Sequence, residues 1–139
     1  MSLSADQLAF THAFAKSCRR SILEMVTRAQ SGHPGGSLSC IDYLSLIYTQ
    51  RVAHSNEPVV VSNGHISPAV YSVLAELKLI PKERVIETFR KPVDIYEGHV
   101  NRKIPGVVYG TGPLGIGGSV ASGIAYGKKL RHEPVSSLP

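Results

Sequence analysis

The chain has 139 residues, 42% of them hydrophobic, and carries a net charge of +5. A chain of this length forms one domain or part of one, and no apolar run reaches the roughly 18 residues that a membrane-spanning helix needs. The lysines and arginines are dispersed without interleaved aromatic residues, which favours anionic small molecules as ligands and argues against a nucleic-acid-binding stripe.

The first thirty residues predict one long amphipathic helix. Ser4 and Gln7 fit a capping box at its start, and Gly32 and Pro34 should end it near Gln30. Its buried face is a stripe with three- or four-residue spacing: Phe10, Phe14, Cys18, Ile22, Met25 and Ala29.

A second helix and a short strand are predicted next. Ser37 or Ser39 can cap a helix whose inner face carries Ile41, Leu44 and Ile47. Residues 59–61 are three valines between turn residues, which predicts a buried strand. The loop after that strand holds His65, at the end of the strand where open α/β sheets bind ligands.

The second half of the chain predicts three more helices around a long loop. Ser67 and Pro68 should start one helix and Pro81 a shorter one, whereas residues 91–105 show no periodicity and form a loop that holds His99. The apolar residues 107–108 precede a glycine-rich segment, residues 109–118. In the helix that follows, Ile116, Val120 and Ile124 can face inward. Its small residues Ser119, Gly123 and Gly127 predict close packing on another helix or subunit, since glycine otherwise costs about 1 kcal/mol there.

The two cysteines, the helical carboxylates and three of the arginines do not indicate a functional site. Cys18 and Cys40 follow no disulfide spacing, and no secretory signal is visible, so we expect two buried thiols in a cytoplasmic protein. The helical carboxylates and off-stripe arginines show no convergent pairing and are interpreted as solvated: Glu24, Asp42, Glu76, Glu87, Arg19, Arg20 and Arg28.

Four short motifs carry most of the functional information. Three contain a Gly-His pair, ending at His33 (Ser-Gly-His-Pro-Gly-Gly), His65 (Ser-Asn-Gly-His) and His99 (Glu-Gly-His), and the fourth is Thr-Gly-Pro-Leu-Gly at residues 111–115. Blocks of this kind occur in this order in the N-terminal region of transketolases, the thiamine-diphosphate enzymes. The chain resembles that region from about Leu8 to Leu130.

The resemblance implies roles for individual residues. His65 would contact thiamine diphosphate, and Gly112, Pro113 and Leu114 would lie against the aminopyrimidine ring of this cofactor. His33 and His99 would be catalytic, contacting the hydroxyls of the ketose donor and helping proton transfer, for which an imidazole is suited near neutral pH. Ile116 departs from the family pattern, which usually has glutamine there, and this bears on substrate choice.

By the same resemblance, part of the enzyme is expected outside this chain. The Gly-Asp-Gly segment that helps the family to hold Mg²⁺, and the glutamate that activates the cofactor, do not occur in these 139 residues. Residues 1–139 are therefore interpreted as a partial pyrophosphate-binding domain of α/β, Rossmann-like class, mostly helical with one or two short parallel strands. The open strand predicts a homo-oligomer, or a hetero-oligomer with a C-terminal transketolase subunit, and no nucleic-acid or membrane partner.

The implied reaction is transfer of a two-carbon ketol unit from a ketose phosphate to an aldose phosphate. The alternative is a catalytically inactive, truncated module that keeps the motifs. Two other interpretations of the residues are disfavoured. A zinc site of three histidines would leave the glycine-rich loop without a role. A dinucleotide fingerprint ending at Glu133 would need residues 107–108 as its first strand, and two residues are very short for that role. Pro113 would also stiffen the loop that should bind the phosphates.

Overall fold

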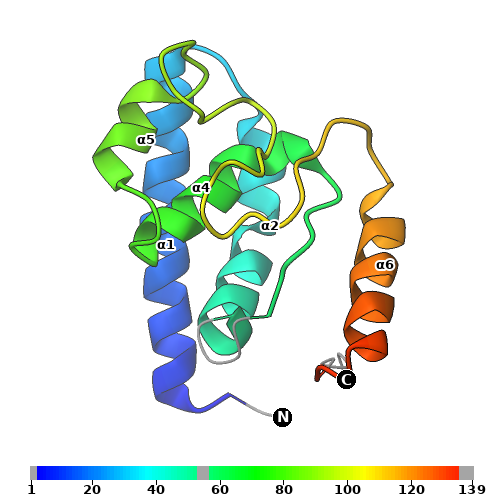
Figure 1. Cartoon of the computed structure of the whole chain (residues 1–139). Coiled ribbons are helices and arrows are strands. Elements are labelled where there is room, and N and C mark those ends of the chain that lie inside the picture. The colour runs from blue at the N-terminus through cyan, green and yellow to red at the C-terminus, as the bar shows by residue number, and fades with distance from the viewer. Residues whose placement is uncertain (1–2, 53–56, 135–139) are drawn as a thin grey trace.

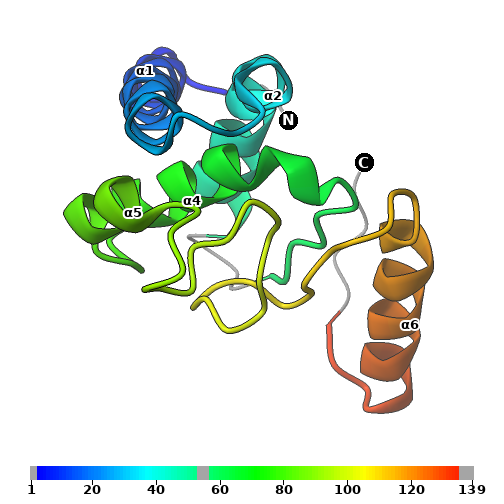
Figure 2. The same cartoon turned by 90° about the horizontal axis from the view of Figure 1, so that it is seen from above.

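The structure, a computed structural model, describes residues 3–52 and 57–134 and consists of helices joined by loops. The α-helices are α1 (Ala5–Ala29), α2 (Pro34–Ile47), α4 (Ser67–Glu76), α5 (Lys82–Thr88) and α6 (Gly117–Leu130), and the short turns are η1 (Tyr48–Val52, π-helical) and η2 (Gly64–Ile66, 3₁₀). Helices α1, α2 and α4 pack on one another, and α5 packs on α1 and α4. Figures 1 and 2 show α6 standing apart from this group.

Helix α1 begins and ends as its sequence predicts. Ser4 Oγ accepts a hydrogen bond from Gln7 N at 3.2 Å, and Gln7 Oε1 accepts one from Ser4 N at 2.9 Å, which completes the capping box. Gln30 ends the helix in the left-handed conformation at φ 50°. Phe14, Cys18, Ile22 and Met25 of the predicted stripe are buried and Ala29 is half-buried, whereas Phe10 is 59% exposed. Thr11 takes the inner position instead, with its Oγ1 3.4 Å from Thr49 Oγ1 of η1.

The middle helices follow the predicted pattern with one shifted start. Helix α2 begins at Pro34, before Ser37, because proline is preorganised for the first helical position. Ile41 and Leu44 are buried as predicted. Helices α4 and α5 are confirmed, and α4 is the most deeply buried element, with every residue from Ser67 to Ala75 in the interior.

The prediction of an α/β fold is wrong for the part of the chain that is described, because residues 3–52 and 57–134 contain no strand. A strand exists only as a member of a hydrogen-bonded ladder. No main-chain hydrogen bond joins residues 59–61 to another described residue, so these three valines form no ladder within residues 3–52 and 57–134. Val107 lies in a turn, where its N–H donates to Ile104 O at 3.1 Å.

Helix α6 forms, but the predicted packing of its small-residue stripe is not found among the described residues. A Cβ placed on Gly123 would have open space around it, and one on Gly127 would approach only the guanidinium of Arg131. Ile116, predicted to face inward, is 40% exposed, and Val120 and Ile124 are half-buried. The helix therefore exposes most of its surface, although its sequence is suited to close packing.

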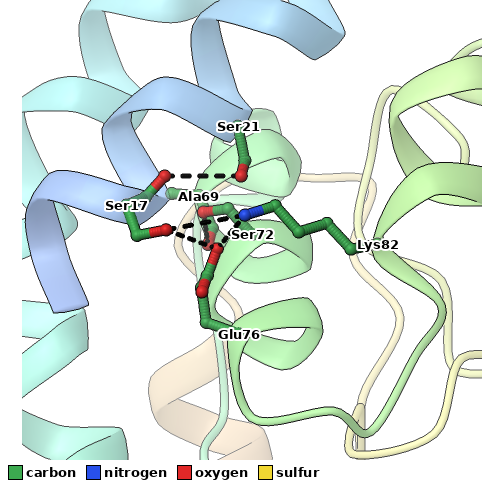
Figure 3. A network of polar contacts seen from close by, with 6 residues as sticks. All are labelled: Ser17, Ser21, Ala69, Ser72, Glu76 and Lys82. Atoms are coloured by element: carbon green, nitrogen blue, oxygen red, sulfur yellow. Dashed lines mark hydrogen bonds and ion pairs between the residues drawn. The ribbon is translucent and has the colours of Figure 1, made fainter.

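Polar contacts join α1 to α4 and α5, and they correct the interpretation of Glu76 as a solvated residue. Its side chain is 19% exposed, forms an ion pair with Lys82 and accepts a hydrogen bond from Ser17 Oγ at 2.8 Å (Figure 3). Cys18 lies beside this network, and its burial raises the pKa of the thiol to about 12. A thiol so buried and protonated is a structural residue.

A second polar contact joins α1 to α2. The Arg19 guanidinium binds Asp42 in a bidentate pair, with Nη1 to Oδ1 at 3.0 Å and Nη2 to Oδ2 at 2.5 Å. This pair lowers the pKa of Asp42 through the hydrogen bonds from Arg19. The two residues are thus paired rather than merely solvated, although an exposed pair of this kind contributes only about 0–1 kcal/mol. No helix in the described part of the chain is both long and apolar enough to cross a membrane.

Candidate functional site

Three histidines that are far apart in the sequence lie together in the structure. The ring centroids of His33 and His65 are 5.1 Å apart, and those of His65 and His99 are 4.6 Å apart. His33 precedes α2, His65 lies in η2, and His99 lies in the long loop after α5. Convergence of the three Gly-His motifs is therefore a property of the fold, and it creates one histidine cluster.

His33 is placed by the turn between α1 and α2. Gly32 has φ 141°, which disfavours other residues, and a Cβ there would lie 3.1 Å from a methyl group of Val26. His33 is the N-cap residue of α2, yet its side chain makes no capping hydrogen bond. The exposed imidazole is therefore available to a ligand.

His65 is held by the residue two positions before it. Asn63 Oδ1 accepts a hydrogen bond from the His65 main-chain N–H at 3.2 Å and lies 3.1 Å from the ring Nδ1. Because a carbonyl oxygen only accepts, Nδ1 must carry the proton of this contact. Nε2 is then the ring nitrogen that can meet a ligand, as an acceptor when the ring is neutral and as a donor when it is charged.

His99 is held through its main chain by two buried side chains of α4. Ser67 Oγ donates to Gly98 O and Tyr71 Oη to His99 O, both at 2.9 Å. Both side chains belong to residues with 0% exposure. The most deeply buried helix of the molecule thereby fixes the position of a loop residue, which is how a loop can carry a defined site.

Gly64 allows the glycine-rich segment to reach the cluster. A Cβ on Gly64 would overlap Thr111 Oγ1, and it would lie 2.9 Å from Thr111 Cβ and 3.1 Å from His99 Cδ2. Thr111 is also fixed by its main chain, whose N–H donates to Val100 O at 3.0 Å. The segment that contains Gly112 therefore starts in contact with the histidine cluster.

The other predicted cofactor-binding residues are exposed beyond this contact. Gly112, Pro113 and Leu114 are all on the surface, and Leu114 is 64% exposed. A Cβ on Gly112 would have no neighbour within 4 Å. The structure thus brings His33, His65 and His99 together and places residues 112–114 next along the chain from Thr111, where all three are exposed.

The electrostatics of the cluster act on His99 above all. Its pKa is lowered from 6.5, first by desolvation and then by the charges of His65, His33 and Arg90. Arg90 lies close to Gly98, since a Cβ on that glycine would be 2.8 Å from Arg90 Nη1. His99 is therefore neutral at neutral pH, as a group that accepts a proton must be.

A proton titration followed by NMR should show this shift directly. We expect the His99 imidazole to titrate below 6.5 in the folded chain, and His65→Gln to move the midpoint upward without restoring it fully, because desolvation remains the larger cause. The folded state releases the His99 proton more readily than the unfolded state does. Protonation of His99 therefore lowers the free energy of unfolding only as the pH falls below about 6.5. A midpoint at or above 6.5 in the wild-type chain would contradict the packing described here.

Thr111 carries a buried hydroxyl with no partner among the described residues. An unsatisfied buried polar atom costs about 1–3 kcal/mol. We therefore expect Thr111→Val to raise the free energy of unfolding of the free chain by up to about 1 kcal/mol, measured by urea denaturation, with Thr111→Ser as the control that keeps the hydroxyl. A loss of stability in the valine variant alone would mean that the hydroxyl has a partner in solution.

Sequence reasoning missed the residues that support the site. Ser67 and Tyr71 looked like parts of an ordinary helix, and nothing in their spacing indicated that their hydroxyls hold residues 98–99. Asn63 and Thr111 belong to the recognised motifs, and Asn63 could have been identified because Asn side chains commonly bond to the main chain two residues later. The role of Arg90 depends on the path of the loop and had no local signal.

The two disfavoured interpretations gain no support. No group of three His, Cys, Asp or Glu residues within 3–52 and 57–134 could hold a metal ion. Glu133 pairs with Arg131 at the exposed end of α6, with Oε1 2.6 Å from Nε, and no described strand precedes the glycine-rich segment. A zinc site and a dinucleotide fingerprint both lack their structural context.

The described residues form a helical domain in which three imidazoles converge next to an exposed glycine-rich turn. Residues 11–136 match the family model described as transketolase, thiamine diphosphate binding domain, so the chain belongs to this family. The resemblance seen in the motifs is thereby confirmed.

Individual relatives agree with this assignment. The chain is 34% identical over 120 residues to one of the subunits of apulose-4-phosphate transketolase from Phocaeicola vulgatus, covering 81% of the chain and 42% of the relative. It is 31% identical over 141 residues to the SqwG subunit of 6-deoxy-6-sulfo-D-fructose transketolase from Clostridium sp., covering 95% and 50%. It is 30% identical over 120 residues to transketolase of Pongo abelii, covering 81% and 19%. The chain thus spans half or less of the length of these relatives.

Proposed function

We propose that this chain contributes one part of the thiamine-diphosphate site of a transketolase assembled from more than one subunit. The observation that carries the proposal is the convergence of His33, His65 and His99, with rings 5.1 and 4.6 Å apart, in a chain of the transketolase family. Two of the relatives are named as subunits of transketolases, which supports a divided enzyme. In this proposal residues 1–139 form part of one domain.

The residues present are compatible with thiamine diphosphate. Thr111 Oγ1 is buried and lacks a described partner beside the cluster, and the exposed Pro113 and Leu114 offer an apolar surface to a flat ring. We assign cofactor binding to His65, Gly112, Pro113 and Leu114, with His65 acting through Nε2 because Nδ1 faces Asn63. When bound, thiamine diphosphate supplies the electron sink that cleavage of a carbon–carbon bond requires.

The catalytic roles fall to His33 and His99. Held neutral by its surroundings, His99 can accept a proton from a substrate hydroxyl, and the exposed His33 can donate or accept a hydrogen bond on the other side of the cluster. The substrate class is a sugar phosphate, and the reaction is transfer of a two-carbon ketol unit. Arg90 beside Gly98 adds a positive charge that favours an anionic substrate.

The remaining parts would come from outside these residues. Mg²⁺ would need ligands from elsewhere, since no described group of His, Cys, Asp or Glu could hold a metal. The activating glutamate would belong to a second subunit or to another copy. The chain therefore orients the cofactor and the substrate, while a partner completes the catalytic apparatus.

Calorimetric titration of thiamine diphosphate with Mg²⁺ tests the proposal, first into the chain alone and then into the chain with a transketolase subunit that carries the pyrimidine-binding domain. We expect binding with the partner present, weakened about tenfold or more (about 1.4 kcal/mol) by His65→Ala. His12→Ala, an exposed histidine on α1, is the matched control and should bind like the wild type. Absence of binding under both conditions would indicate an inactive module that only retains the motifs.

A further inference from the structure

The loop between α5 and His99 is closed on itself. Arg90 N donates to Tyr96 O at 2.8 Å, which brings the two ends of residues 90–96 together. Arg90 also has a left-handed main chain, with φ 58°. A residue other than glycine keeps this conformation only where the surrounding structure holds it. Contacts within the loop or beside it must therefore keep it in this shape.

Asp94 holds the middle of this loop against α5. Its side chain is only 5% exposed. Oδ2 accepts a hydrogen bond from Arg84 Nε at 2.6 Å and lies 3.0 Å from Thr88 Oγ1, and both of these residues belong to α5. Oδ1 accepts a hydrogen bond from the main-chain N–H of Ile95 at 2.8 Å. Both carboxylate oxygens are thus bonded, as a buried carboxylate requires, and together they tie the loop to the helix.

The loop that Asp94 holds leads directly to His99. Tyr96, two residues after Asp94, is buried, and its ring centroid lies 5.8 Å from that of Tyr71. Tyr71 of α4 is the residue whose hydroxyl bonds to His99 O. His99 therefore has two supports, because α4 holds residues 98–99 directly and α5 holds the preceding loop through Asp94.

The same loop also places a positive charge beside the histidine cluster. Arg90 begins the closed loop, and its Nη1 would lie 2.8 Å from a Cβ placed on Gly98. The charge of Arg90 adds to desolvation in lowering the pKa of His99. A loop held in one shape therefore fixes this charge as well as the imidazole.

Asp94 acts on His99 through the loop rather than through its own charge. The charges that act on His99 come from the cluster and from the ends of the loop: His65, His33, Arg90 and Glu97. Asp94 is not one of them. The hydrogen bond from Arg84 lowers the pKa of Asp94, so this carboxylate stays charged over the whole range in which His99 titrates.

We propose that Asp94 is a positioning residue of the candidate site, which ties the loop to α5 and thereby fixes both His99 and the Arg90 charge beside it. In this role Asp94 touches neither substrate nor cofactor. The inference rests on the proposed function, because the position of His99 matters for catalysis only if His99 accepts a proton there. The tie itself needs no cofactor, so it can be tested in the chain alone.

NMR titration of the imidazoles in the full chain, without thiamine diphosphate, tests the inference through Asp94→Asn. The amide replaces one of the two accepting oxygens by a donor, so it cannot accept from both Arg84 Nε and Ile95 N. We expect the released loop to expose His99, whose midpoint should rise toward 6.5 as desolvation and the Arg90 charge weaken. The Arg90 amide, whose hydrogen bond closes the loop, should exchange faster. A loss of stability alone would not move a midpoint measured in the folded chain.

Two substitutions control for changes that leave the tie intact. Val93→Asn introduces the same amide one residue earlier, on a side chain that is 74% exposed, and Asp42→Asn removes an arginine-paired carboxylate from α2. Both should leave the His99 midpoint at the wild-type value. Arg84→Gln removes only the α5 guanidinium and should move the midpoint in the same direction as Asp94→Asn, but less.

The outcomes decide between a positioning role and an ordinary surface pair. An unchanged His99 midpoint in folded Asp94→Asn, or in Arg84→Gln if the first variant does not fold, would overturn the inference. An equal shift in Val93→Asn would overturn it too, because the loop would then respond to any substitution. Loss of thiamine-diphosphate binding in the calorimetric titration bears on the proposed function instead, so the two failures are distinguishable.

Discussion

Gly64→Ala is expected to lower the free energy of unfolding by about 1–3 kcal/mol, the usual cost of overpacking a filled interior. The added Cβ would overlap Thr111 Oγ1 and approach His99 Cδ2 to 3.1 Å. Thr111 has little freedom to withdraw, because its N–H is bonded to Val100 O. The substitution should therefore also displace His65 or His99, visible as large changes in their imidazole NMR signals together with a lower urea midpoint.

A glycine elsewhere in the chain gives the matched control for this experiment. Gly123 lies in the middle of α6, where a Cβ would meet nothing within 4 Å. Gly123→Ala should therefore stabilise the helix by about 0.5–1 kcal/mol, since alanine is the better helix former. If Gly64→Ala and Gly123→Ala had the same effect, the close contact of Gly64 with Thr111 would not exist in solution.

Tyr71→Ala should be more damaging still, with an expected loss of about 3–5 kcal/mol, as for other buried aromatic residues. The ring is fully buried, with its centroid 5.8 Å from that of Tyr96 and 6.3 Å from that of Phe89, in edge-to-face geometry. Its hydroxyl also bonds to His99 O. Thermal or urea unfolding measures the loss, and the position of His99 can be followed through its imidazole signals.

The variant Tyr71→Phe separates the two roles of this residue. Phenylalanine keeps the ring contacts and removes only the hydrogen bond to His99 O, so we expect a loss of about 1 kcal/mol. The signals of His99 should still shift, whereas those of His33, which is held by a different segment, should not. A variant that is as stable as the wild type and leaves the His99 signals unchanged would show that α4 does not position this loop.

The part of the fold that could be predicted depends on local chemistry. The capping box at Ser4, the prolines at the starts of α2 and α4, and the periodic apolar residues of α1 and α4 each act within a few residues, so helices were identified correctly. Phe10 was misplaced because two residues of the same turn, Phe10 and Thr11, can both continue the stripe. Only the position of η1 decides between them.

The local sequence could not decide whether residues 59–61 form a strand. Three valines have the propensity for a strand, but a strand needs a neighbour, and no described segment pairs with residues 59–61. The same holds for α6, whose small residues are suited to close packing while the described chain offers no surface to pack against. Glu76 likewise looked solvated, and only the approach of α1 and α5 gives it Ser17 and Lys82 as partners.

By itself, the amino-acid sequence determined the helices, the motifs and, through them, the transketolase family, because each of these depends on residues close together along the chain. The tertiary structure alone decided that His33, His65 and His99 meet, that α4 fixes residues 98–99, and that the valine segment lines a groove without pairing to another described residue. Contacts between residues distant in sequence depend on how helices pack as rigid bodies, and local propensities carry no information about that packing.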